Sequence, residues 1–185
     1  MTHQGLLNPF HSRWAIPIIS ILYDQKGAKF ITLLKELKIS RSVLASTLRK
    51  LIDQKLVMRN PGYGHPLRPE YLLTDQGLRF GPFCKDMMTF VTEMKRYRLI
   101  QSKWALQIIH LCSGGDIRFS ELKSALTPIT SRALSEELKS LNSEGYIERR
   151  IIEGYPPVTA YSLAKKSIPF IKVIEKYKGV LAPFL

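Results

Sequence analysis

The chain has 185 residues, 45% of them hydrophobic, and a formal net charge of +13 at pH 7. This composition is typical of one or two globular domains and excludes a largely disordered chain. The longest apolar run, Trp14–Tyr23, is too short to cross a bilayer, and no signal-peptide pattern precedes it. We therefore expect a cytoplasmic protein with no membrane partner, whose basic surface attracts a polyanion such as nucleic acid.

The sequence carries no pattern typical of an enzyme. The four histidines are scattered without metal-ligand spacing, and no G-x-S-x-G motif occurs. Cys84 and Cys112 are too few for a disulfide framework and are interpreted as small buried hydrophobic residues. We therefore predict no catalytic site, no metal and no cofactor.

The first elements in chain order are short helices. Residues 1–12 are predicted to form a loose arm, followed by a helix from about Ile16 to Tyr23 and a turn from Asp24 to Ala28. Phe30, Leu33 and Leu37 then recur at helical spacing and predict a second helix that ends before Ile39.

A third helix begins after Ser40, whose hydroxyl can satisfy free N–H groups of the first turn. Leu44, Leu48 and Leu51 stand at i, i+4 and i+7 and form one apolar face. The side chains of the opposite face are short, polar or basic, namely Ser42, Ala45, Ser46 and Arg49.

Two strands are predicted next, Leu56–Arg59 and Glu70–Leu73, separated by a segment rich in Gly and Pro that requires a turn. A helical stretch of about Asp75–Leu99 follows. Helix, helix, helix, hairpin, helix is the order of a winged helix-turn-helix, in which the recognition helix enters the major groove and the wing contacts the backbone or the minor groove.

The same order returns about ninety residues later. Trp14 matches Trp104, and the three leucines of the third helix match Leu134, Leu138 and Leu141. A long-period match of this kind predicts two copies of one domain, which we place at 1–98 and 99–185. The predicted fold class is mainly α with small β-hairpins (α+β), as two tandem winged helix-turn-helix domains.

The elements predicted for the second copy are a short helix around Phe119–Leu126, a helix after Thr130, strands at Tyr146–Ile151 and Ala160–Leu163, and a helix over Lys165–Lys178.

These motifs resemble the HxlR-type winged-helix transcriptional regulators, present here as a tandem pair. The resemblance rests on Lys103–Ile109, Arg118–Leu122, Ile129–Leu134, Gly145–Arg149 and Tyr155–Leu163, with looser counterparts in the first copy. It implies a cytoplasmic regulator that binds DNA as a two-fold dimer, through an interface of its first and last helices. Some members sense oxidants through a cysteine just before the first helix, and neither copy has a cysteine there. Family members usually carry one domain per chain, so the joined copies predict an intramolecular pseudo-dimer, with further homodimerisation left open.

The residues predicted to contact DNA lie on two recognition helices, about 40–53 and 130–143, and on two wings, about 57–73 and 147–163. Arg49 and Arg132 are the preferred base readers, because arginine can bond guanine with two donors. The other residues are candidate contacts to phosphates, which position the protein, or to bases, which specify the sequence. The full set is Arg41, Ser42, Ser46, Arg49, Lys50, Arg68, Arg132, Ser135, Lys139, Arg149 and Arg150.

The two recognition faces differ in charge. Ser46 and Thr47 are matched by Glu136 and Glu137, so we expect two unequal half-sites, with the first copy contributing more backbone affinity. Glu136 either neutralises nearby cations such as Arg132 or accepts a hydrogen bond from cytosine. The main alternative function is a tandem winged-helix protein–protein interaction module without sequence-specific DNA binding, because a fold does not settle a function.

Overall fold

The computed structural model describes residues 12–60, 70–153, 155 and 157–182. Contacts divide them into two compact units, residues 12–103 with 179–182 and residues 104–178. Each unit is a winged helix-turn-helix with the same order of helices and strands. The predicted fold class, mainly α with small β-hairpins in two tandem copies, is confirmed.

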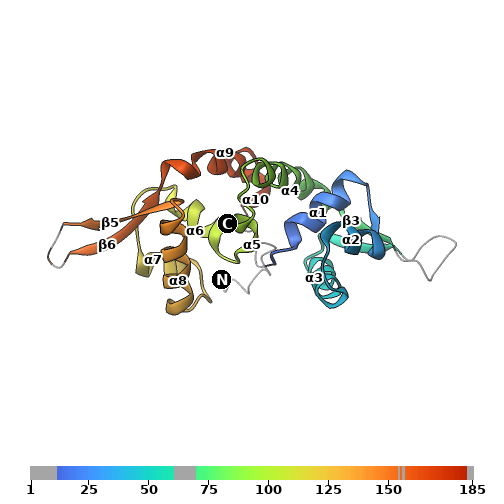
Figure 1. Ribbon diagram of the computed structural model, residues 1–185, viewed down its shortest axis with the longest axis horizontal. Helices are drawn as coiled ribbons and strands as arrows, with labels where there is room; N and C mark the ends of the chain where they lie inside the picture. Colours follow the sequence, from blue (N-terminus) through green and yellow to red (C-terminus); the bar gives the residue numbers. More distant parts are fainter. Residues whose placement is uncertain (1–11, 61–69, 154, 156, 183–185) are drawn as a thin grey trace. The chain divides into compact units, whose positions relative to one another are not determined.

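The first unit begins with three helices and a short strand, continues through a two-stranded wing and closes with a long helix (Figure 1). Its elements are α1 (Ala15–Asp24), β1 (Ala28–Lys29), α2 (Phe30–Leu37), α3 (Arg41–Asp53), β2 (Val57–Asn60), β3 (Glu70–Leu73), α4 (Asp75–Glu93) and α5 (Arg98–Gln101).

The core of the first unit forms where α1 packs along α4. Ile18 of α1, Leu44 of α3 and Phe83 of α4 are fully buried there. Gly81 allows the close approach of the two long helices, because a Cβ at this position would lie 2.2 Å from the Tyr23 ring. This packing leaves the opposite face of α3 exposed to solvent.

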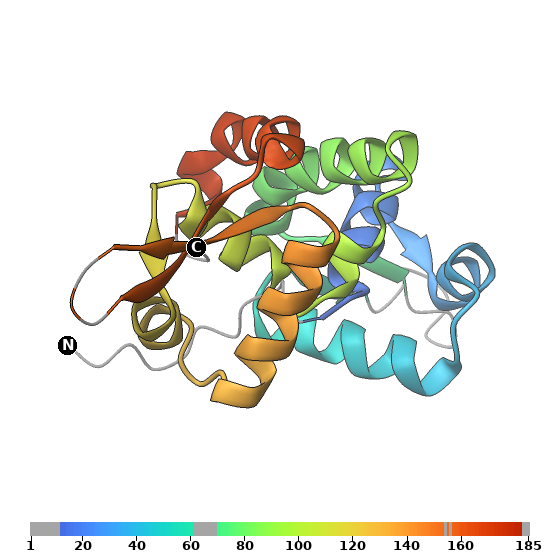
Figure 2. The ribbon, with the colours of Figure 1, turned by 60° about the vertical axis from the view of Figure 1, so that its left-hand side comes forward.

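The second unit repeats the plan with longer wing strands, and Figure 2 shows its hairpin extending away from its helices. Its elements are α6 (Ala105–Cys112), β4 (Ile117–Arg118), α7 (Phe119–Ala125), α8 (Ser131–Ser143), β5 (Ile147–Ile152), β6 (Val158–Leu163), η2 (Lys165–Ser167) and α9 (Ile168–Lys176). The last helix, α10 (Lys178–Leu181), falls within the first unit except for Lys178.

Each wing belongs to a three-stranded antiparallel sheet, ordered β1-β3-β2 in the first unit and β4-β6-β5 in the second. Ala28 pairs with Tyr71, and Ile117 pairs with Tyr161 at the matching place. The turn predicted over Asp24–Ala28 was therefore wrong at both ends, because Asp24 closes α1 and Ala28 begins β1. A strand of two residues is too short to show a period, so its partner strand defines it.

The predicted closing helices were too long. The stretch Asp75–Leu99 was expected to be continuous, but α4 ends at Glu93 and Lys95 follows with φ +53. The stretch Lys165–Lys178 begins with the 3-10 turn η2 before α9. Apolar spacing continues across both breaks, so periodicity alone could not locate them. The predicted arm lies outside the described residues except for Ser12, as does most of the first wing turn.

Candidate nucleic-acid interface

Helix α3 is fixed at its start by a side-chain cap. The hydroxyl of Ser40 accepts a hydrogen bond from the backbone N–H of Val43 at 3.3 Å. Leu48 and its two leucine neighbours along the helix are buried, which turns the other face toward solvent. The contact residues predicted on this helix are all exposed: Arg41, Ser42, Ser46, Arg49 and Lys50.

An open pocket, here called the arm-side pocket, runs along one edge of the exposed face of α3. Arg13 lies with its guanidinium 5.0 Å from the centre of the Trp14 ring, and this cation–π contact positions the charge. The lining contains two cations and four hydroxyls but no carboxylate, so it suits an anion. The lining residues are Ser12, Arg13, Trp14, Ser42, Val43, Ser46, Thr47 and Lys50.

Helix α8 has the same construction. The hydroxyl of Thr130 accepts from the backbone N–H of Ala133 at 3.2 Å, and Leu134, Leu138 and Leu141 are buried. The contact residues predicted on this helix, Arg132, Ser135 and Lys139, are exposed.

The exposed face of α8 carries an ion pair. Nε of Arg132 lies 2.9 Å from Oε1 of Glu136, and the two side chains are 86% and 66% exposed. An exposed i,i+4 pair adds only about 0.3–0.5 kcal/mol to stability. Its larger consequence is electrostatic, since the carboxylate neutralises a cation that would otherwise face a polyanion.

The base of the second wing is tied to α8. Oδ1 of Asn142 accepts a hydrogen bond from the backbone N–H of Arg149 at 3.0 Å. The Arg149 guanidinium lies 3.4 Å from the Thr159 hydroxyl on the neighbouring strand. Arg150 lies next to it but donates a hydrogen bond to the Glu148 carboxylate at 2.7 Å, and this bond raises the pKa of the guanidinium.

A second pocket, here called the wing-side pocket, lies between α8 and this wing. Like the arm-side pocket, it contains two cations and no carboxylate. Asn142 uses its oxygen on the Arg149 backbone, so its NH₂ group remains as a donor toward an incoming group. The lining residues are Ser135, Leu138, Lys139, Asn142, Arg149 and Tyr161.

Sequence reasoning found most of the cations of both pockets but missed Arg13, Asn142 and Tyr161. The arginine could have been found from its place before Trp14, since the second copy repeats a cation before Trp104. The roles of the asparagine and the tyrosine depend on strand register, which the spacing of residues did not give. Arg68 lies outside the described residues.

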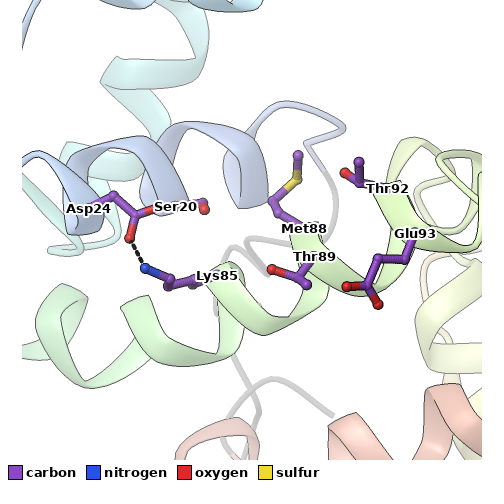
Figure 3. A pocket seen from close by; sticks show the side chains of 7 residues that line it. All are labelled: Ser20, Asp24, Lys85, Met88, Thr89, Thr92 and Glu93. Atoms are coloured by element: carbon purple, nitrogen blue, oxygen red, sulfur yellow. Dashed lines mark hydrogen bonds and ion pairs between the residues drawn. The ribbon is translucent and has the colours of Figure 1, made fainter.

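A third pocket, between α1 and α4, has a different character (Figure 3). Lys85 is paired with Asp24 at 2.5 Å, and this hydrogen bond raises the pKa of the lysine. Glu93 lies at the other end of the pocket. Its lining has two carboxylates and one cation, so it suits an anion less well than either pocket beside a recognition helix.

Other kinds of site have little support in the part of the chain that the structure describes. None of the acidic, histidine and cysteine side chains there forms a group of three or more that could hold a metal ion. No described helix combines the length and apolarity needed to cross a membrane. Cys84 and Cys112 are buried free thiols, as predicted.

The chain is similar to known regulators in both units. Residues 10–97 and again 99–180 match the family described as HxlR-like helix-turn-helix. The HTH-type transcriptional regulator BH0655 of Halalkalibacterium halodurans is 37% identical over 79 residues, which cover 42% of this chain and 70% of that protein. The regulator YvaP of Bacillus subtilis is 34% identical over 86 residues, 45% of this chain and 80% of its own. The reduced form of the regulator YodB from B. subtilis aligns with 50% of this chain and 91% of its own, at 25% identity and a TM-score of 0.43.

Proposed function

The chain belongs to the HxlR-like helix-turn-helix family, with two copies of its domain, and we propose that it is a sequence-specific regulator of transcription that binds double-stranded DNA in the cytoplasm. The observation that carries the proposal is the pair of recognition helices, each with a buried leucine face and exposed cations beside an anion-compatible pocket. In this proposal α3 and α8 enter the major groove, and the wings contact the backbone or the minor groove.

We further propose that the two domains, divided near residues 98 and 99, act as an intramolecular pseudo-dimer. The family model matches the chain twice, and the two relatives named above match 42% and 45% of it, about the length of one copy. Because the copies differ at Ser46 and Glu136, the half-sites are unequal. Light scattering at micromolar concentration should give the mass of one chain. A mass of two chains would contradict the intramolecular form.

The experiment that tests the main proposal is selection of bound duplexes from a random DNA library, followed by affinity measured against salt. We expect a pseudo-palindrome with half-sites about one helical turn apart. The log–log slope should correspond to several released counterions. Absence of any enriched sequence, with weak binding that vanishes at physiological salt, would overturn the proposal.

The second candidate function is the protein–protein interaction module. Two observations favour it: the acidic pair Glu136 and Glu137 on α8, and the apolar side chain of Ile151, 70% exposed on the second wing. Acidic side chains on the recognition helix repel the phosphates of DNA, and a protein partner can cover an exposed apolar side chain. This candidate predicts that no sequence is selected, and the same library experiment separates the two functions.

A further inference from the structure

We propose that the two units hold the DNA backbone on different sides of their recognition helices: the first at the arm-side pocket, the second at the wing-side pocket. This inference rests on the proposed DNA-binding function and adds to it which phosphates each unit holds. The ligand of each pocket is a phosphodiester of the bound duplex.

The arm-side pocket is suited to an anion only in the first unit. At an offset of ninety residues, Ser46 and Thr47 of its lining are replaced by Glu136 and Glu137, and Lys50 is replaced by Ser140. The aligned positions also hold two cations, Lys103 and Arg132, so two carboxylates balance them, and Arg132 is already paired with Glu136. A phosphate placed there would find no net positive charge and would meet two carboxylates, which disfavours binding.

The wing-side pocket has more hydrogen-bond donors in the second unit than at the aligned positions of the first unit. Ser135 and Asn142 supply a hydroxyl and an amide, whereas the aligned residues of the first unit are Ala45 and Ile52. The cations are kept, since Arg49 is aligned with Lys139. The second unit can therefore surround a phosphate with neutral donors as well as charge, and the first unit has charge without those donors.

The two pockets lie on different sides of the recognition helix. At about 100° per residue, Ser46 and Lys50 project from one side of the exposed face of α3. Positions aligned with Ser135 and Asn142 project from the other side. A duplex lying across either helix would therefore place different phosphates, relative to the centre of the half-site, at the two pockets.

The test uses the full chain and the duplex found by library selection. Uncharged methylphosphonate linkages are introduced one at a time, and affinity is measured for the wild type and for Arg13→Gln, Lys50→Gln, Lys139→Gln and Arg149→Gln. Each variant should weaken binding and lower the salt slope by about 1. Arg79→Gln on α4 and Lys172→Gln on α9 are matched controls, because these exposed cations lie on closing helices outside both pockets.

We expect the Arg13 and Lys50 variants to become insensitive to one linkage in one half-site. The Lys139 and Arg149 variants should become insensitive to a linkage in the other half-site, and the pseudo-two-fold axis of the site should not relate the two linkages. The proposal is overturned if that axis relates them, or if the Arg13 and Lys50 variants bind as tightly as the controls. Failure of the wild type to select any sequence would instead count against the proposed function.

A second measurement separates a phosphodiester from a free anion. Inorganic phosphate is titrated into the free wild-type protein and into Lys50→Gln. We expect no saturable binding at millimolar concentration, because one shallow site lacks the other contacts that a duplex provides. Saturable binding that Lys50→Gln abolishes, together with unchanged DNA affinity in that variant, would assign the pocket to a free anion and overturn the proposal.

Discussion

The hydroxyl of Ser167 donates a hydrogen bond to the carbonyl oxygen of Tyr146 at 2.7 Å, in the buried interior of the second unit. Gly77 is aligned with this serine in the first unit, and Leu56 is aligned with the tyrosine. A Cβ on Gly77 would lie only 2.0 Å from the Leu56 carbonyl oxygen. The same junction between wing and closing helix is therefore bridged by a hydroxyl in one unit and closed by direct backbone approach in the other.

Substitution at this junction should have unequal costs. Gly77→Ala drives a methyl group into a carbonyl and should destabilise the first unit by about 2–3 kcal/mol, the upper part of the range for overpacking. Ser167→Ala removes one buried hydrogen bond and should cost about 1 kcal/mol, since the backbone N–H of Ala164 still reaches the same carbonyl at 3.2 Å. Amide hydrogen exchange, followed separately for the amides of each unit, measures both losses of stability. Equal protection loss in the two variants would contradict the close-approach account.

The contact between α1 and α4 gives a second prediction. Gly81→Ala would place its Cβ 2.2 Å from the Tyr23 ring, so the ring or the helix must move. We expect the free energy of unfolding of the first unit to fall by about 2 kcal/mol. Tyr23→Ala should remove most of that penalty, and a double-mutant cycle should show strong coupling between the two positions. Additive effects in the cycle would show that the ring does not cause the cost.

Much of the fold could be predicted from the sequence, because the same apolar spacing occurs twice. Leu44 and Leu134 each begin a buried leucine face on a capped helix, as predicted. The short strands were missed because a two-residue strand such as Ala28–Lys29 is defined by its partner. The break after Glu93 was missed because a lysine with positive φ, Lys95, is an uncommon stop signal.

The site was only partly predictable. The helical period predicts which face of each recognition helix is exposed. The predicted DNA-contact residues on α3 and α8 are all exposed. The pairing of Arg132 with Glu136 follows from their spacing of four. The role of Asn142 does not, because its oxygen accepts from a backbone N–H seven residues away, across a turn whose geometry the sequence pattern did not define.

Freeing Arg132 should strengthen DNA binding. Glu136→Ser installs the residue that the first unit carries at the aligned position and removes the carboxylate 2.9 Å from the guanidinium. Affinity for the selected duplex should rise, and the slope of log affinity against log salt should steepen by about 1. Glu93→Ser on α4 is the control for a general change in net charge. A weaker complex, with specificity lost at one base pair, would show that Glu136 reads cytosine instead.

Neither cysteine should respond to thiol reagents while the protein is folded. Burial raises the pKa of Cys84 well above its ordinary value and that of Cys112 from 9.0 to about 12. Because the thiolate is the reacting form, almost none is present at pH 8. Mass spectrometry after brief iodoacetamide treatment should show no alkylation of the native chain and two alkylated sites in urea. Diamide should leave DNA affinity unchanged, and rapid native alkylation would contradict this prediction.

Stability of the second unit should decrease on mild acidification because of His110 on α6. This side chain is partly buried, and its Nδ1 has no hydrogen-bond partner among the described residues. Burial lowers its pKa from the ordinary 6.5, outweighing the opposite effect of Glu175, while Lys178 lowers it further. The unfolded chain therefore binds the proton more readily than the folded chain, so stability decreases as pH falls below about 6.5 toward the folded pKa. Urea unfolding between pH 7.5 and 5.5 should show this loss, and His110→Ser, which installs the residue aligned at Ser20, should reduce it. A steeper loss in the variant would assign the pH dependence to other groups.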